Sequence, residues 1–431
     1  MSTLPDAATT VSPSPLVVRT HAIADPGPLL ALLPEAGPEE TLSWVRHEEG
    51  LVGWGKAVCL EVSGPDRFRV ADDWWRELSA HAVVRDEVRL PGTGPVVFGS
   101  LPFSDESADA GILVVPEVVV GRRGGRWWVT TTGHHAQLPP IPQLAPTSIP
   151  KPPAVVTFAD GSLSTTAWKR AVAQAVDRIT GGRLDKVVLA RDLEARSPDT
   201  IDVRWLLHHL AERYERTWTF SVAGLVGATP ELLVRRDQGL VTSRVLAGTI
   251  RRTGDDAKDL ALAASLARSS KDLEEHEYAV RSVARSLAPH CSSMNVPEAP
   301  FVLHLSNVMH LASDVTGVTA NRAASSLALA ASLHPTAAVG GTPTDVAVDL
   351  IAELEGMDRG RYAGPVGWMD SSGDGEWGIA LRCGRFADGD ASAVRLFAGC
   401  GIVAGSDPDA EVAEADAKFV PMRDALTATS P

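Results

Sequence analysis

The sequence predicts an α+β fold, because β-like runs follow one another in series while helical segments lie between those series. In the N-terminal third, short apolar runs alternate with turn residues, which is typical of strands. In the remainder, amphipathic helical patterns separate groups of two or three strands. A doubly wound sheet would instead alternate single strands with single helices, and the sequence has no repeat of solenoid or propeller length.

Composition limits the classes of function. The 431 residues are 44% hydrophobic and 22% charged, with a formal net charge of −14, as in a soluble globular protein that does not bind nucleic acid. An anionic substrate would need locally clustered cations, and Arg382 and Lys418 are the candidates. Four cysteines without CxxC spacing favour a reducing cytoplasm and no structural zinc.

The N-terminal part begins with residues 1–15, whose Pro, Ser, Thr and Ala content predicts a disordered leader without a signal-peptide core. Residues 16–137 are predicted to be rich in strands, with one helix near residues 72–82. The apolar stretch 111–121 is too short to span a membrane and is interpreted as buried β-structure. The prolines of residues 138–153 predict an extended surface connector.

Residues 154–428 alternate helices and strands. A helix is predicted over 164–180, ended by Gly181 and Gly182 in a left-handed cap, followed by a strand at 185–196 and a helix at 203–214. Three strand-like runs over 217–252 predict an antiparallel meander. The pattern then predicts further helices at 257–268, 271–287, 323–331 and 344–357, and strand pairs near 301–315 and 362–386.

Two acidic pairs stand out on the predicted helices. Asp272 with Glu275, and Glu411 with Glu414, are each three residues apart, so each pair shares one helix face. Facing one another across a cleft, they would offer the oxygen ligands that Mg²⁺ prefers; alternatively, they are solvated helix faces. The glycine-rich segment 398–408 precedes the second pair, and a helix start of this kind can offer backbone amides to an anion.

Seven segments, in this order, resemble the chorismate-utilising enzymes, the superfamily of isochorismate, anthranilate, aminodeoxychorismate and salicylate synthases. The resemblance covers residues 168–426. The segments are KVVLAR from Lys186, ATPELL around Glu231, LAGT at 246–249, KDLEEH at 271–276, HPTAAVGGTP at 334–343, RGRYAGPVGW at 359–368 and AGCGIVAGSDPDAEVAEADAK to Lys418. The resemblance implies two antiparallel sheets packed face to face, with helices outside and the site in the cleft between the sheets.

Within that family, the segment HPTAAVGG is similar to the HPTPAVGG of the isochorismate synthase branch, with Ala337 in place of proline. The resemblance implies that Lys186 is the general base, and burial beside apolar neighbours would lower the pKa of a lysine enough for this role. It makes Glu231 the general acid. The alternatives are a solubilising lysine at a strand edge and a glutamate in water.

The resemblance also implies a cofactor and a substrate site. Glu275 and Glu414 would bind Mg²⁺ directly, and Asp272 and Glu411 would hold its water ligands. Lys418 is alternatively an ordinary ion-pair partner of Glu414, His334 a structural hydrogen-bonder, and Cys400 a contributor of backbone rather than a nucleophile. The implied substrate-binding residues are Gly248, Thr249, His334, Tyr362, Arg382, Gly399, Cys400, Gly401 and Lys418.

We therefore expect a cytoplasmic, monomeric isomerase that converts chorismate to isochorismate without a glutaminase subunit, a nucleic acid or a membrane. Salicylate synthase and the aminating synthases are the alternatives within the family. A catalytically inactive chorismate-binding scaffold is the alternative from another class. The sequence leaves open whether the product feeds menaquinone, siderophore or salicylate synthesis.

Overall fold

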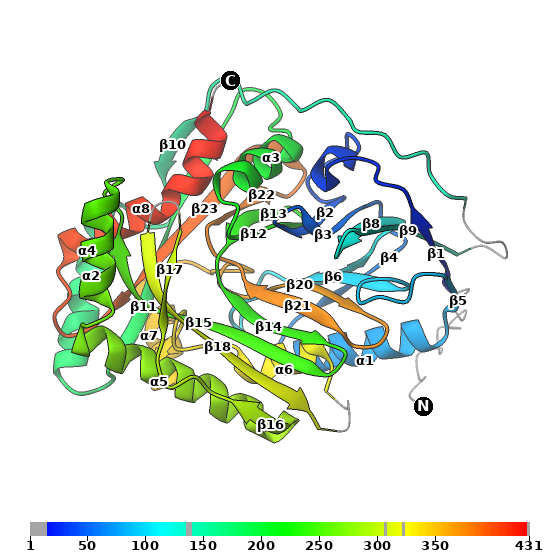
Figure 1. Ribbon diagram of the computed structural model, residues 1–431. Helices are drawn as coiled ribbons and strands as arrows, with labels where there is room; N and C mark the ends of the chain where they lie inside the picture. The colour runs from blue at the N-terminus through cyan, green and yellow to red at the C-terminus, as the bar shows by residue number, and fades with distance from the viewer. Residues whose placement is uncertain (1–14, 135–139, 306–307, 321–323, 429–431) are drawn as a thin grey trace, which may run out of the picture.

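The computed structural model describes residues 15–134, 140–305, 308–320 and 324–428 (Figure 1). Two large sheets form its centre. The 13-stranded sheet runs in the spatial order β10 (Thr157–Asp160), β11 (Lys186–Arg196), β23 (Asp390–Ile402), β22 (Cys383–Ala387), β13 (Leu225–Thr229), β12 (Trp218–Val222), β2 (Thr41–Arg46), β3 (Glu49–Trp54), β8 (Val118–Arg123), β9 (Arg126–Gly133), β1 (Val17–Ile23) and β5 (Val83–Asp86), with β19 (Gly341–Thr342) beside β11.

The 10-stranded sheet runs in the order β16 (Cys291–Asn295), β18 (Val308–Thr319), β15 (Leu240–Arg251), β14 (Leu232–Asp237), β21 (Gly375–Ile379), β20 (Pro365–Asp370), β6 (Val96–Ser100), β7 (Gly111–Val115) and β4 (Val58–Val62), with β17 (Phe301–His304) beside β18. Among the described strands, only β1 and β5 pair in parallel. The prediction of two antiparallel sheets is therefore confirmed.

The helices lie outside the two sheets (Figure 1). They are α1 (Arg67–Ala80), α2 (Thr165–Thr180), α3 (Val203–Arg213), α4 (Asp256–Leu266), α5 (Ser270–Leu287), α6 (Ser326–Leu333), α7 (Thr344–Leu354) and α8 (Pro408–Thr427), with 3₁₀ turns at Leu29–Leu32 and Ala288–His290. The larger sheet is contacted by α2, α3, α7 and α8, and the smaller by α1, α4, α5 and α6. None of the described helices is long and apolar enough to cross a bilayer.

The N-terminal strands complete both sheets instead of forming a sheet of their own. β2 pairs with β12 in the larger sheet, and β6 pairs with β20 in the smaller one. One large hydrophobic core spans both parts of the chain, and its fully buried side chains include Trp44, Phe98, Trp168 and Trp377. The rest of the chain therefore depends on the N-terminal third for its folded state, because apolar burial is the dominant stabilising contribution.

The predicted meander over residues 217–252 is wrong. β12 and β13 form a hairpin in the larger sheet, whereas β14 and β15 form a hairpin in the smaller one. The chain crosses between the sheets at Pro230 and Glu231. Proline has no N–H for a ladder hydrogen bond, so the strand ends before it. This crossing places Glu231 in the space between the two sheets.

Local signals in the sequence were accurate at several boundaries. Ser164 caps α2 by accepting a hydrogen bond from the Ala167 N–H, but only Gly182, with φ of 75°, adopts the predicted left-handed conformation; Gly181 has φ of −73°. Residues 140–153 contain neither helix nor strand. The four cysteines form no disulfide. The predicted leader lies almost wholly outside the described residues.

Candidate active site

A cavity of about 390 Å³ opens where the two sheets diverge, between β11 and β23 on one side and β15 and β18 on the other. The N-terminal turns of α5 and α8 contribute to its wall, as does the crossing at Glu231. Thirteen of the residues predicted for the site line this cavity: Lys186, Glu231, Gly248, Thr249, Asp272, Tyr362, Arg382, Gly399, Cys400, Gly401, Glu411, Glu414 and Lys418.

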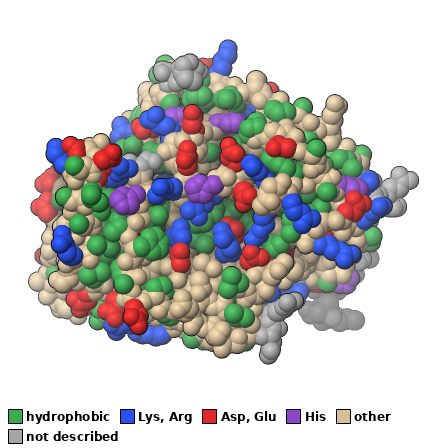
Figure 2. Space-filling model, in the orientation of Figure 1, with side chains coloured by type: hydrophobic (Ala, Val, Ile, Leu, Met, Phe, Trp, Pro, Cys, Tyr) green, Lys and Arg blue, Asp and Glu red, His purple; other side chains and the backbone are tan. Residues whose placement is uncertain are grey.

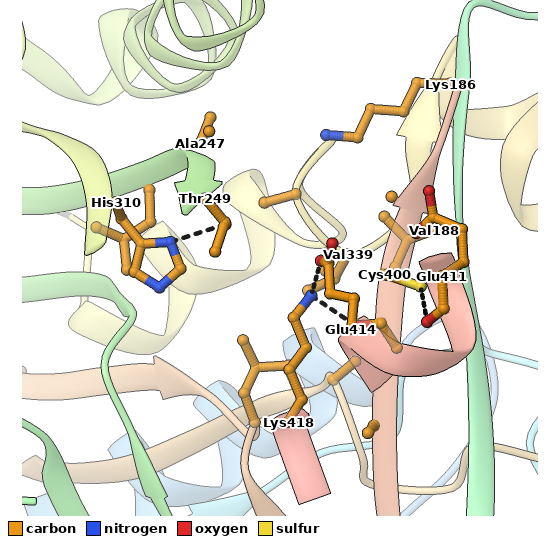
Figure 3. A pocket seen from close by; sticks show the side chains of 18 of the residues that line it. Lys186, Val188, Ala247, Thr249, His310, Val339, Cys400, Glu411, Glu414 and Lys418 are labelled. Carbon is orange, nitrogen blue, oxygen red and sulfur yellow. Dashed lines mark hydrogen bonds and ion pairs between the residues drawn. The ribbon is translucent and has the colours of Figure 1, made fainter. Parts of the chain in front are cut away.

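Lys186 is the first residue of β11, and its side chain points into the cavity (Figure 3). The side chain passes directly over Gly401 of the neighbouring strand β23. A Cβ atom at position 401 would lie 2.8 Å from Lys186 Cε, so the end of the lysine side chain would have to move aside. Gly401 thus leaves the space through which the lysine reaches the cavity, a reason for glycine that the sequence did not reveal.

Glu231 is a buried carboxyl group whose protonation is shifted by its surroundings in the cavity. Glu231 is 7% exposed. Burial raises the pKa of its carboxyl group from 4.5 to about 7, although the positive charges of Lys186, Lys418 and Arg382 act to lower this pKa. Loss of solvation disfavours the charged carboxylate. A carboxyl group of this kind keeps its proton near neutral pH and can deliver it to a leaving group.

Besides Lys186 and Arg359, two more basic side chains line the cavity, Arg382 and Lys418. Lys418 Nζ lies 2.7 Å from Glu414 Oε1 and donates to the Gly399 carbonyl oxygen at 2.8 Å (Figure 3). The ion pair expected as the alternative role of Lys418 is therefore present. Burial lowers the pKa of the Arg382 guanidinium, with Tyr362 and Glu414 opposing that shift. No side-chain hydrogen bond or ion pair joins Arg382 to another described residue, so its N–H groups can donate to a carboxylate.

Basic side chains are also concentrated outside the cavity. Figure 2 shows Lys and Arg gathered across the middle of one face, among Asp and Glu, where the two sheets face one another in Figure 1.

The acidic residues approach the cavity from two helices. Asp272 on α5 and both Glu411 and Glu414 on α8 line it. Glu411 Oε2 is buried and has no hydrogen-bond partner among the described residues, which is costly for a carboxylate oxygen and is the environment that a bound cation would satisfy. No three His, Cys, Asp or Glu side chains form a complete metal site within the described residues, and the side chain of Glu275 lies outside them.

The helix start at α8 does not offer its amides to an anion, so that prediction is wrong. Asp407 caps the helix, and its carboxylate accepts hydrogen bonds from the N–H groups of Asp409 and Ala410. Pro408 at the first helical position has no N–H. The first N–H groups of the helix are therefore already hydrogen-bonded to Asp407.

The wall formed by β15 and β18 contains a hydrogen-bonded pair, Thr249 with His310, of which the sequence analysis identified only Thr249. Gly248, with φ of 74°, forms a bulge in β15, and a Cβ there would lie 3.2 Å from Asp272 Cβ. Beyond the bulge, Thr249 Oγ1 is hydrogen-bonded to His310 Nδ1 at 2.9 Å. Burial lowers the pKa of His310 to about 3, so its imidazole is neutral.

His310 was missed because a single histidine inside an apolar strand is usually a core residue. The signal that could have found it is the register of β15 with β18, which pairs Thr249 with His310. That register is a tertiary feature. Cross-strand neighbours are close enough to interact directly, so a residue already assigned to the site would have indicated its partner.

Tyr362 and Cys400 are two further predicted residues that line the cavity. The Tyr362 ring stacks on Phe397, with 5.0 Å between ring centroids, and burial raises the pKa of its hydroxyl. Burial also raises the pKa of the Cys400 thiol well above its usual value. A neutral thiol is a poor nucleophile, which agrees with the expectation that Cys400 contributes backbone.

His334 is not in this cavity, contrary to its predicted place in the substrate site. It lines a separate cavity beside α1, where its Nε2 lies 2.9 Å from the Phe103 carbonyl oxygen. Burial lowers its pKa to about 4, and its ring packs against Phe68 and Phe103. The structure thus places His334 in the structural role that was its alternative.

The sequence is similar to known proteins of one family. Residues 6–427 match the family described as "Chorismate binding enzyme". The chain is 37% identical over 353 residues to the isochorismate synthase DhbC of Bacillus subtilis, covering 77% of this chain and 81% of that relative. It is 34% identical over 415 residues to the salicylate biosynthesis isochorismate synthase of Pseudomonas aeruginosa, covering 90% and 85%.

A solved structure shares the fold across nearly the full length. MenF, the menaquinone-specific isochorismate synthase of Escherichia coli, superimposes with a TM-score of 0.76 at 24% identity, covering 97% of each chain. At this identity the likeness shows the shared architecture and nothing about specificity.

Proposed function

Because the chain belongs to the chorismate-binding enzyme family and therefore uses chorismate, we propose that it is an isochorismate synthase. The reaction is the attack of water at C2 of chorismate, with movement of the ring double bond and loss of the C4 hydroxyl. Water supplies the new hydroxyl, and the old one leaves as water after protonation. Substrate and product are therefore isomers, and no other reactant is consumed.

The observation that carries the proposal is the pairing of a buried, protonated carboxyl group with a lysine in one cavity. Glu231, with its pKa raised to about 7, holds the proton that the departing C4 oxygen needs. Lys186 lines the same cavity and takes a proton from the attacking water. An acid and a base on opposite ends of the substitution are what a hydroxyl exchange requires.

The remaining residues suit a substrate with two carboxylates. Arg382 can bind one carboxylate with two parallel hydrogen bonds, and Lys418 adds a second positive charge beside Gly399. Glu275 and Glu414, with Asp272 and Glu411 beyond them, would hold the Mg²⁺ on which members of the family generally depend. When bound, the ion would draw negative charge from the ring carboxylate and orient it.

The test is to incubate the purified chain with chorismate and Mg²⁺, with and without ammonium salts, and to separate the products by chromatography with mass detection. We expect isochorismate alone in both cases. Ammonium arrives charged beside a lysine and must lose a proton before it can attack. Salicylate with pyruvate, or an aminated product at high ammonia, would assign the chain to another branch of the family; absence of turnover would leave a binding protein.

We also expect the acidic residues to separate into two groups in a Mg²⁺ titration. Glu275→Ala and Glu414→Ala should raise the Mg²⁺ concentration for half-maximal activity further than Asp272→Ala and Glu411→Ala, for which losses of about 10- to 100-fold are typical of groups that act through bound water. Equal shifts in all four variants would contradict this division. A larger shift for Glu411→Ala would make its unpaired oxygen a direct ligand.

A further inference from the structure

A buried ion pair, Glu355 with Arg359, lies immediately after α7, and Arg359 is among the residues that line the cavity. Glu355 and Arg359 have side chains that are 0% and 3% exposed, and Arg359 Nε donates to Glu355 Oε2 at 2.9 Å. Such a pair adds little net stability over apolar residues of the same volume, because both charges lose their hydration. The pair instead contributes through the backbone groups to which its two side chains are hydrogen-bonded.

The pair is bonded to the backbone of the cavity wall at three points. Arg359 donates from Nη1 to the Val339 carbonyl oxygen and from Nη2 to the Val188 carbonyl oxygen, both at 2.8 Å. Glu355 Oε1 accepts the Ala190 N–H at 2.7 Å. All three guanidinium nitrogens are therefore donors to protein oxygens, and the pair ties β11 to the segment that contains Val339.

These hydrogen bonds are important because the first residues of β11 have only a short partner strand on one side. At Lys186 and Val187 the partner on one side is β19, which has only two residues. The next bond on that side runs from the Val188 N–H to the Gly340 carbonyl oxygen at 2.8 Å. Arg359 donates to the carbonyl oxygens of Val188 and of Val339, which precedes Gly340. Its planar guanidinium group therefore fixes the position of β11 relative to the segment that contains Val339.

We propose that Glu355 and Arg359 are positioning residues for the reaction. Through the backbone of Val188, Ala190 and Val339 they fix the start of β11, from which Lys186 extends into the cavity two residues before Val188. This inference rests on the proposed function, in which Lys186 is the base. A misplacement of about 1 Å of a reacting group can reduce a rate by about 100-fold, so the tie affects turnover more than substrate binding.

The experiment replaces the pair by apolar residues of similar size in the variant Glu355→Met/Arg359→Met. We expect kcat to fall about 10- to 100-fold with KM within about twofold of wild type, because the substrate-binding groups stay in place. The matched control is Arg236→Met/Asp374→Leu, which removes another buried pair, 3% and 7% exposed, outside the cavity. Its kcat should equal that of wild type. Arg359→Lys, which keeps the charge but has one nitrogen, should lose kcat as well and serves if the double variant does not fold.

Hydrogen exchange of the backbone amides, followed by mass spectrometry, tests the hydrogen bond from Ala190 to Glu355 without any assay of product. We expect the Ala190 amide to exchange at least about tenfold faster in Glu355→Met/Arg359→Met and at the wild-type rate in the control pair. A double variant with unchanged kcat, or a control that loses kcat equally, would overturn the inference. If the wild type makes no isochorismate, the proposed function fails, whereas unchanged exchange at Ala190 refutes the tie itself.

Discussion

Lys186→Ala should lose about 10²- to 10⁴-fold in kcat, which is the usual contribution of a positioned general base. In the proposed mechanism the lysine takes the proton from the attacking water, and we expect alanine to leave the strand β11 unchanged. The measurement is the rate of isochorismate formation from chorismate at saturating Mg²⁺. Unfolding by heat and a Mg²⁺ titration should match the wild type, so that a loss of rate is assigned to chemistry.

The control for this variant is Lys169→Ala. Lys169 lies on α2, outside the cavity, and forms an ion pair with Asp409 at the surface. Its loss should leave kcat and KM unchanged, since exposed ion pairs contribute little. A rate for Lys186→Ala within about threefold of the wild type would remove Lys186 from the mechanism.

Glu231→Gln should be comparably damaging, because the amide keeps the shape of the carboxyl group but has no acidic proton for the C4 oxygen. In the wild type the acid must be protonated, so kcat/KM should fall as the pH rises through about 7, the pKa of Glu231. The variant should lack this decline. Glu77→Gln on the exposed surface of α1 is the control, and a normal rate in Glu231→Gln would require another acid.

The same shift predicts an effect on stability, and its direction follows from proton binding. The pKa of Glu231 is raised on folding, so the folded state binds the proton more tightly than the unfolded state. The stabilisation is complete below about pH 4.5 and is lost as the pH rises to about 7. Relative to Glu231→Gln, the wild type should lose on the order of 3 kcal/mol of unfolding free energy across this range, measured by urea denaturation.

Much of the fold could be predicted because it depends on local patterns. The boundaries of α2 and α5 follow from a serine cap and from the periodicity of apolar residues, both of which are visible within one segment. The strand at 185–196 could be placed because its apolar run is bounded by polar residues. The meander was mispredicted because the choice of sheet for each hairpin depends on which partner strands arrive from elsewhere, such as β2 and β21.

The site shows the same division. Motifs resembling a known family identified thirteen residues that the structure brings into one cavity, although they come from strands and helices distant in sequence. They also misplaced His334, because a motif marks a residue as typical of a family without saying which cavity its side chain faces. His310 was not identified, and Arg359 was only part of a quoted segment, because the contacts of His310 with Thr249 and of Arg359 with Val188 and Val339 are made between segments distant in sequence.

The sequence by itself determined the class of fold, the family and the chemical types of the candidate groups, because periodicity, capping and motif spacing are properties of short segments. Only the tertiary structure decided that the Glu231 carboxyl keeps its proton near neutral pH, that Gly401 clears a path for Lys186 and that Asp407 closes the start of α8. Each of these depends on desolvation, steric contact or hydrogen bonding set by the folded surroundings. The raised pKa of the carboxyl group and the close packing beside the glycine arise only when the two sheets enclose them.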